Sequence, residues 1–181
     1  MKRIVADVRK CMACRACEIA CAVSHVEGED LVGAISSGRA RKRVYVEAAG
    51  CLAVPLQCRH CEDAPCVKVC PSGALSRLSP GAPVLVQEER CIGCEFCVQA
   101  CPFGVIRLAT VASSDGTTSR RAVVKCDLCV ARQAKGMKPA CVSACPTGAI
   151  EFREADDSAR DARRRTACEE AAAVERGTEK A

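Results

Sequence analysis

Short apolar runs alternate with cysteine-rich polar stretches along this chain. Residues 4–6, 83–86 and 122–124 are apolar, and each run stands shortly before a group of cysteines. Short runs of this kind, rich in β-branched residues, predict strands. A Pro-x-Gly triplet follows three of the cysteine groups, where it would end a short helix and turn the chain into another strand. Each unit is therefore predicted to contain a strand, a cysteine loop, a short helix and a second strand.

The segments between and after these units carry different patterns. Residues 113–117 fit a hairpin turn between the apolar residues 106–108 and 122–124. Residues 22–57 form an insertion, with a helix predicted around 30–35 and a strand at 44–47. Residues 154–181 are rich in Ala, Arg and Glu. They predict a charged helix that either has a solvated face or docks on a partner.

One cysteine pattern occurs four times along the chain. The third copy matches the Cys-x2-Cys-x2-Cys-x3-Cys-Pro run of bacterial ferredoxins. The second and fourth copies are longer in the middle, and the first has Ala22 in place of the proline. The sixteen cysteines, copy by copy, are Cys11, Cys14, Cys17 and Cys21; Cys58, Cys61, Cys66 and Cys70; Cys91, Cys94, Cys97 and Cys101; and Cys126, Cys129, Cys141 and Cys145.

Composition changes the picture of the core. Only 2% of the 181 residues are aromatic, tryptophan is absent, and cysteine and small side chains make up much of the 49% apolar share. Something other than side chains must therefore fill the centre of a domain of this length. Eighteen cysteines suggest either a disulfide scaffold in a secreted protein or metal binding in a reducing compartment.

The first residues favour metal binding. The charged start leads directly into cysteine-rich sequence with no apolar signal segment, and no apolar run has the length of a transmembrane helix. We therefore expect a cytoplasmic protein with no direct membrane span. The formal charge of +5 falls to roughly −3 when four oxidised clusters of about −2 each are counted. With so few aromatic residues for base stacking, we expect no nucleic-acid binding.

The cysteine spacing discriminates between metals. Structural zinc usually joins two Cys-x2-Cys pairs across a longer loop, whereas a cysteine triplet followed by Cys-Pro is typical of cubane clusters. In the ferredoxin run the fourth cysteine ligates the other cluster, so the copies are expected to work in pairs. We therefore predict four [4Fe–4S] clusters, with zinc and disulfides as the alternatives. Since no copy lacks a cysteine, no [3Fe–4S] centre is expected.

The arrangement resembles the four-cluster ferredoxin-like subunits that accompany molybdenum, tungsten, nickel–iron and carbon monoxide dehydrogenase enzymes. The resemblance spans about residues 1–153 and is most specific at CEIACAV (17–23), PLQCRHCEDAPC (55–66) and CIGC (91–94). Within this family, the sequence is most similar to three kinds of subunit. These are the iron–sulfur partner of carbon monoxide dehydrogenase, the small subunits of formate dehydrogenase or formate hydrogenlyase, and the iron–sulfur subunit of tungsten aldehyde oxidoreductases.

The resemblance implies an α+β fold of two pseudo-twofold, bacterial-ferredoxin-like modules of βαβ type, with short helices and hairpins around the clusters. Residues 1–153 would form the polyferredoxin domain, comprising an outer module of about 1–25 plus 122–153, an inner module of about 52–110 and the insertion 22–57; residues 154–181 would form a charged helical tail. The implied ligand sets are Cys58, Cys61, Cys66 and Cys101; Cys91, Cys94, Cys97 and Cys70; Cys11, Cys14, Cys17 and Cys145; and Cys126, Cys129, Cys141 and Cys21.

The predicted function is electron transfer without catalysis. The sequence has no glycine-rich nucleotide motif and no nucleophile–base pair. The expected partners are a catalytic molybdenum, tungsten or nickel oxidoreductase subunit and a second carrier, flavin or hydrogenase subunit, and copies of the chain could also stack. The basic run 39–43 and the charged tail favour dedicated docking. A diffusible polyferredoxin and an iron–sulfur maturation factor are the alternatives.

Four further residues are interpreted as structural. Cys51 precedes an apolar stretch and is expected to be a small buried side chain, whereas Cys168 lies in the predicted tail helix. The cluster ligands are complete without His25 and His60. Because His60 stands between Cys58 and Cys61, a hydrogen bond from it to sulfur would shift the potential of that cluster.

Overall fold

The computed structural model describes residues 2–26, 28–112 and 119–178. The turn predicted at 113–117 lies outside these residues. In the part of the chain that is described, eight strands form four two-stranded antiparallel sheets. The protein is therefore a small α+β structure of short helices and strand hairpins. The strands are β1 (Lys2–Ala6), β2 (Val44–Ala49), β3 (Leu52–Gln57), β4 (Leu75–Ser76), β5 (Leu85–Val86), β6 (Arg107–Ala112), β7 (Ser119–Val124) and β8 (Ile150–Glu154).

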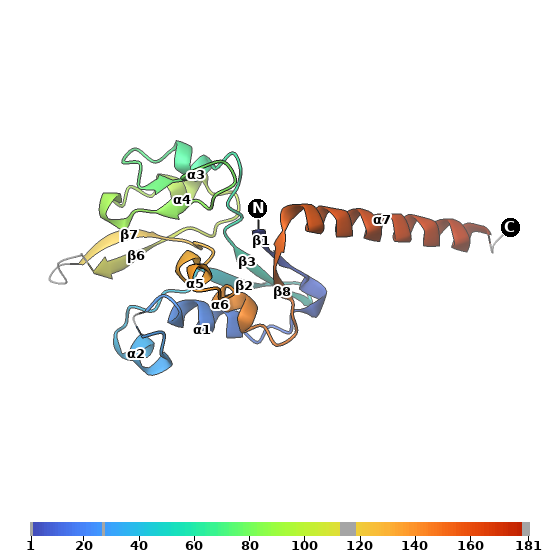
Figure 1. Cartoon of the computed structure of the whole chain (residues 1–181), viewed down its shortest axis with the longest axis horizontal. Helices are drawn as coiled ribbons and strands as arrows, with labels where there is room; N and C mark the ends of the chain where they lie inside the picture. Colours follow the sequence, from blue (N-terminus) through green and yellow to red (C-terminus); the bar gives the residue numbers. More distant parts are fainter. Residues whose placement is uncertain (1, 27, 113–118, 179–181) are drawn as a thin grey trace.

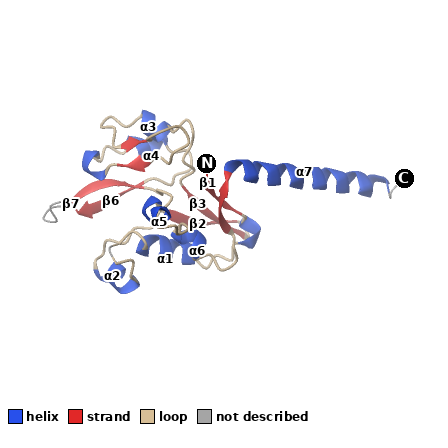
Figure 2. Cartoon of the chain, viewed as in Figure 1, coloured by secondary structure: helices blue, strands red, loops and turns tan. Residues whose placement is uncertain are grey.

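The helices are short except at the C-terminal end (Figure 2). They are α1 (Ala16–Val23), α2 (Leu31–Ser36), α3 (Pro65–Lys68), α4 (Phe96–Ala100), α5 (Val130–Ala134), α6 (Ala140–Ser143) and α7 (Ala155–Thr178), with 3-10 turns at Val8–Lys10 and Glu88–Arg90. The helix predicted around 30–35 is α2, the strand predicted at 44–47 begins β2, and the charged tail is helical as expected. No helix in the described ranges is long and apolar enough to span a membrane.

Strands from different cysteine copies pair with each other. Strand β1 precedes the first copy and pairs with β8, which follows the fourth copy. Likewise, β5 precedes the third copy and pairs with β4, which follows the second copy. Both pairs continue by one backbone hydrogen bond, from Asp7 N to Ala149 O and from Gln87 N to Ala74 O, each 2.8 Å long. A 3-10 turn then leads into Cys11 and into Cys91. The same order of elements thus occurs twice.

Two groups of buried side chains form the interior, and cysteine belongs to both. One group contains Ile4, Cys17, Cys21, Val44, Val46, Cys126, Leu128, Cys141 and Ile150. The other contains Ala64, Cys66, Leu75, Val84, Cys97, Ile106 and Val123. In Figure 1 the second group corresponds to the part with α3 and α4, above α1 and α6, and α7 projects away from both. Apolar side chains therefore surround sulfur instead of packing only on one another.

The insertion packs against the first of these groups. Its strand β2 contributes Val44 and Val46, and Ala53 of β3 packs against them. Strand β3 directly precedes the second cysteine copy and includes the apolar stretch that follows Cys51, for which no strand is predicted from the sequence. The hairpin β2–β3 therefore supports the first and fourth cysteine copies instead of standing apart from them.

Cys51 is exposed, which corrects the expectation that it is buried. The pairing of Ala49 with Leu52 leaves Gly50 and Cys51 as the two residues of a tight hairpin loop. Gly50 has a φ of 60°, which suits glycine in such a turn. The Cys51 side chain is consequently outside the core.

We expect the substitution Leu75→Ala to lower the free energy of unfolding by about 2–5 kcal/mol, because it leaves a cavity in a packed interior. Leu75 is 2% exposed, whereas Leu78, three residues along, is 86% exposed. The matched variant Leu78→Ala should change the free energy by less than about 0.5 kcal/mol. Anaerobic guanidinium unfolding followed by circular dichroism measures both, and equal losses would contradict this account of the core.

Candidate iron–sulfur centres

Each cysteine loop bends through a left-handed residue directly before its second cysteine. These residues are Ala13 (φ 59°), His60 (49°), Gly93 (70°) and Leu128 (60°). Only one of the four is glycine, so the other three carry a backbone strain that the surrounding structure must support. In the second and fourth copies the N–H of this residue donates to the sulfur of the first cysteine, from His60 N to Cys58 Sγ and from Leu128 N to Cys126 Sγ, both 3.4 Å long.

The helix that contains the third cysteine of each copy ends in one of two ways. In copies two, three and four the Pro-x-Gly triplet places Gly73, Gly104 and Gly148 at φ between 61° and 63°. The N–H of each donates to the carbonyl of the preceding cysteine, at 3.2–3.3 Å. Copy one lacks this triplet, and α1 continues past Cys21 to Val23. The missing proline thus lengthens the helix by a turn and leaves Cys21 buried.

The second and third copies bring their sulfurs together. Burial raises the pKa of the Cys66 thiol, and the neighbouring Cys58, Cys101 and Cys61 raise it further, against an opposing effect of Lys125. Burial likewise raises the pKa of Cys97 to about 11, together with Cys70, Cys91 and Cys66. Helices α3 and α4 also contact each other. Cys101 of the third copy therefore lies near Cys66 of the second, and Cys70 of the second lies near Cys97 of the third.

The first and fourth copies also bring their sulfurs together. Burial raises the pKa of Cys17 to about 11 against a hydrogen bond from the Glu18 backbone, and the neighbouring Cys14 and Cys145 raise it further. Burial also raises the pKa of Cys141 well above its usual range, with further contributions from Cys21, Cys129 and Cys17. Helices α1 and α6 are in contact. The sulfur of Cys145 thus lies near those of Cys14 and Cys17, and that of Cys21 lies near those of Cys129 and Cys141. The four ligand sets themselves stay predictions.

The sulfur groups fit an iron–sulfur core chemically. Burial and neighbouring sulfurs make these thiols difficult to ionise. A cationic metal centre binds thiolate and therefore favours the ionised form. Two of the fourth cysteines already have partners suited to a thiolate. Although burial raises the pKa of Cys70 and Cys145, hydrogen bonds from the backbone N–H groups and hydroxyls that follow lower it overall. All eighteen cysteines lie within the described residues, and none of them forms a disulfide.

Glu18 connects the first cysteine copy to the insertion. Its side chain is buried, its Oε1 accepts the N–H of Val46 at 2.7 Å, and its Oε2 accepts Lys42 Nζ at 2.8 Å. The pKa of Glu18 is raised by burial but lowered overall by these partners. A glutamate within a cysteine loop gave no sequence signal for this role, because its partners lie more than twenty residues away.

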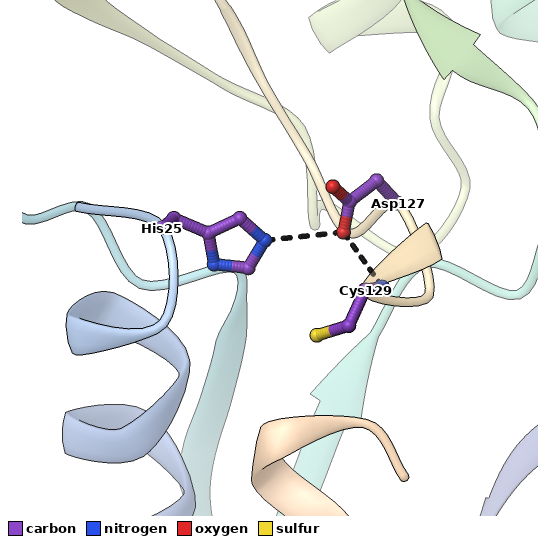
Figure 3. A group of neighbouring side chains, drawn as sticks. All are labelled: His25, Asp127 and Cys129. Atoms are coloured by element: carbon purple, nitrogen blue, oxygen red, sulfur yellow. Dashed lines mark hydrogen bonds and ion pairs between the residues drawn. The ribbon is translucent and has the colours of Figure 1, made fainter. Parts of the chain in front are cut away.

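His25 and Asp127 lie beside Cys129 (Figure 3) and, with Arg43, form a second connection. His25 Nε2 lies 3.1 Å from Asp127 Oδ1, Asp127 Oδ1 accepts the N–H of Cys129 at 2.8 Å, and Arg43 lies 2.8 Å from Asp127 Oδ2. Ligand atoms of His25, Asp127 and Cys129 fall within 4.8 Å of one another. Since Cys129 belongs to a sulfur group, the trio is better explained as support for that loop than as a separate metal site.

The basic run at 39–43 has partners within the molecule. Lys42 pairs with Glu18 and Arg43 with Asp127, and the N–H of Arg43 donates to Cys21 Sγ at 3.3 Å. Arg41 donates to the carbonyls of Gly38 and Ala40. These contacts weaken the argument that the run is free for docking. Charge density in a sequence does not reveal whether the charges are satisfied internally.

His60 acts through its backbone. Its N–H donates to Cys58 Sγ, whereas its imidazole Nδ1 accepts the N–H of Val84 at 3.0 Å. The side chain is 1% exposed, and burial, followed by the charge of Lys125, lowers the pKa of the imidazole to about 3. The ring is therefore neutral and packs between segments, and the hydrogen bond to sulfur does not involve it.

Comparison with known proteins agrees with this geometry. Residues 49–155 match the family model of the 4Fe-4S dicluster domain. The chain is 46% identical over 160 residues to an iron-sulfur protein of Rhodospirillum rubrum, covering 84% of this chain and 82% of that protein. It is 40% identical over 174 residues to the electron transport protein HydN of Escherichia coli K12, covering 91% and 96%.

A further relative is the thiosulfate reductase electron transfer subunit PhsB of Salmonella typhi, 40% identical over 157 residues, which are 84% of this chain and 75% of that one. The matches extend beyond the cysteine loops into the segments that connect them. This chain is a ferredoxin-like iron–sulfur protein. It belongs to the 4Fe-4S dicluster domain family.

The charged contact of His25 predicts a pH-dependent stability. Burial lowers the pKa of His25, but the bond to Asp127 and the interaction with the Cys21 side chain outweigh it and raise the pKa to about 9. Because this folded-state pKa lies above the unfolded value of about 6.5, the contribution is complete below pH 6.5 and is lost as pH rises through 9.

The difference in unfolding free energy between the wild type and His25→Gln should therefore be about 1.5–3 kcal/mol at low pH, as for hydrogen bonds to charged groups. It should shrink between pH 6.5 and 9, as denaturant unfolding at several pH values would measure. Asp63→Asn, which removes an exposed partner of Lys68, serves as the control and should give no such trend. A difference that is constant with pH would contradict the assigned protonation.

Proposed function

We propose that this protein is the electron-transfer subunit of a larger oxidoreductase and carries four [4Fe–4S] clusters. When bound, such clusters accept and donate single electrons. The observation that supports the proposal is that the fourth cysteine of each copy lies near sulfurs of a partner copy: Cys101 near Cys66, Cys70 near Cys97, Cys145 near Cys17 and Cys21 near Cys141. The proposed ligand sets are those that the family resemblance implies, in two pseudo-twofold modules: copies one and four form the outer module, copies two and three the inner.

The residues of this chain hold and insulate the clusters. Buried aliphatic side chains such as Leu75 and Val123 exclude water from around the sulfurs. Backbone N–H groups donate to Cys21, Cys58 and Cys126, and such bonds tune cluster potentials. Four cysteines per cluster leave no iron open to a substrate, which supports a role without catalysis.

The partner we propose is a catalytic subunit with molybdenum, tungsten or nickel, of the carbon monoxide dehydrogenase, tungsten aldehyde oxidoreductase or formate dehydrogenase type. The similarity to PhsB, an electron transfer subunit of thiosulfate reductase, supports assignment to a complex. A second carrier would connect to the opposite end of the cluster chain. We propose a cytoplasmic location, on the argument from cysteine content and reducing compartments alone.

A count of iron tests the ligand sets. Anaerobically purified wild type should contain about sixteen iron and sixteen sulfide per chain, and Cys101→Ala should lose one cluster, leaving about twelve iron. Cys51→Ala is the matched control, because Cys51 is exposed and lies outside every sulfur group; it should retain the full count.

Double variants identify which cysteines share a cluster. If Cys58 and Cys101 ligate the same cluster, the variant lacking both should still contain about twelve iron. Loss of Cys91 together with Cys101 should remove two clusters and leave about eight. The reverse pattern would refute the exchange between copies two and three, and zinc in place of iron would refute the cluster proposal.

Purification under anaerobic conditions tests the partner. A molybdenum, tungsten or nickel enzyme should copurify with the chain in a constant ratio, as mass spectrometry and metal analysis would measure. A fully loaded chain that purifies alone would instead favour the diffusible polyferredoxin. Release of a partner after one cluster transfer would favour the maturation factor.

A further inference from the structure

Lys125 is a buried lysine between the two halves of the protein. It follows β7 and directly precedes Cys126, and it is 2% exposed. Lysine is almost never buried to this extent unless its charge is compensated. Its Nζ donates to the carbonyl oxygens of Val84 and Cys126, the latter at 2.8 Å. Both acceptors are neutral, and none of the ion pairs within the described residues includes Lys125.

The bonds of Lys125 complete a path between two sulfur groups. Cys58 Sγ accepts the N–H of His60, and His60 Nδ1 accepts the N–H of Val84. Val84 O accepts Lys125 Nζ, which also donates to the carbonyl of Cys126. The path thus begins at a sulfur of copy two and ends at a cysteine of copy four. Val84 and Cys126 belong to different buried groups, so Lys125 lies where the two halves meet.

The charge of Lys125 acts on the sulfurs of copy two. Burial raises the pKa of Cys58, and Lys125 is the next largest influence, in the opposite direction. Lys125 also opposes the rise in the pKa of Cys66. His60, the titratable side chain on the same path, is held neutral by burial. Lys125 therefore places a positive charge near the sulfurs of copy two, at the residue directly before Cys126 of copy four.

We infer that the Lys125 ammonium raises the reduction potentials of the two clusters on either side of it, and so favours electron transfer between the halves. These are the clusters proposed on Cys58, Cys61, Cys66 and Cys101 and on Cys126, Cys129, Cys141 and Cys21. Reduction adds one negative charge to a cluster, and a nearby cation in a water-poor interior stabilises the reduced form. The inference rests on the proposed four-cluster function.

Redox titration of the full cluster-loaded chain, followed by electron paramagnetic resonance, tests this role. In Lys125→Met, two of the four midpoint potentials should fall, each by about a tenfold change in the equilibrium constant for reduction, or about 59 mV for a one-electron couple. The other two should not move. Lys125→Arg keeps the charge and should restore the wild-type values. Lys135→Met removes the same formal charge from an exposed position, where water and salt screen it, and should leave all four unchanged.

Unchanged potentials in a fully loaded Lys125→Met would overturn the inference, as would an equal shift of all four clusters. If the methionine variant does not assemble, Lys125→Gln keeps an N–H donor for the two carbonyls and must show the same two shifts. Loss of clusters in both neutral variants, with Lys125→Arg intact, would assign the residue to folding and overturn the inference. Wild type with fewer than four clusters would instead refute the proposed function itself.

Discussion

Crowding of buried thiols is the constraint on which this fold depends. Four groups of cysteine sulfurs lie in a small interior where burial raises the thiol pKa and each sulfur raises that of its neighbours. Such a centre is unfavourable for thiolates without a cation, so the folded state and iron–sulfur binding depend on each other. The scarcity of aromatic side chains follows, because inorganic cores occupy the volume that aromatic rings fill in other domains.

The proposed exchange of the fourth cysteine between copies accounts for the chain's topology. A cysteine after the helix of one copy must reach the loop of another, so two copies have to meet closely. The short antiparallel pairs β1–β8 and β4–β5 bring about these two meetings. The first of them joins the beginning of the described chain to residues near 150. Long-range pairing, rather than an extended sheet, therefore holds the structure together.

The repeat could be predicted from sequence because its ligands, prolines and glycines follow one another at fixed spacing. The side chains that hold the cysteine loops in place could not be predicted in this way. They are Glu18, Arg43 and Asp127, and their partners lie in distant segments of the chain, which cysteine spacing does not reveal. The sequence also gives no sign of the left-handed backbone conformation at Ala13, His60 and Leu128. Of the four corresponding residues, only Gly93 is of the type that this conformation favours. The expectation that Cys51 is buried is wrong because Gly50 and Cys51 form a two-residue turn, which the apolar residues after Cys51 do not indicate.

The residue before each second cysteine indicates how the loops are oriented. Ala13 is exposed and Gly93 half-buried, whereas His60 and Leu128 are buried. Large apolar side chains accompany the outward loops, with Met12 at 63% exposure and Ile92 at 67%. Loops one and three therefore reach the surface, while loops two and four face the interior near Lys125. Under the proposed function, an electron would enter and leave the protein through loops one and three, which reach the surface. It would cross between the two modules at loops two and four, so Lys125 lies where electrons pass from one module to the other.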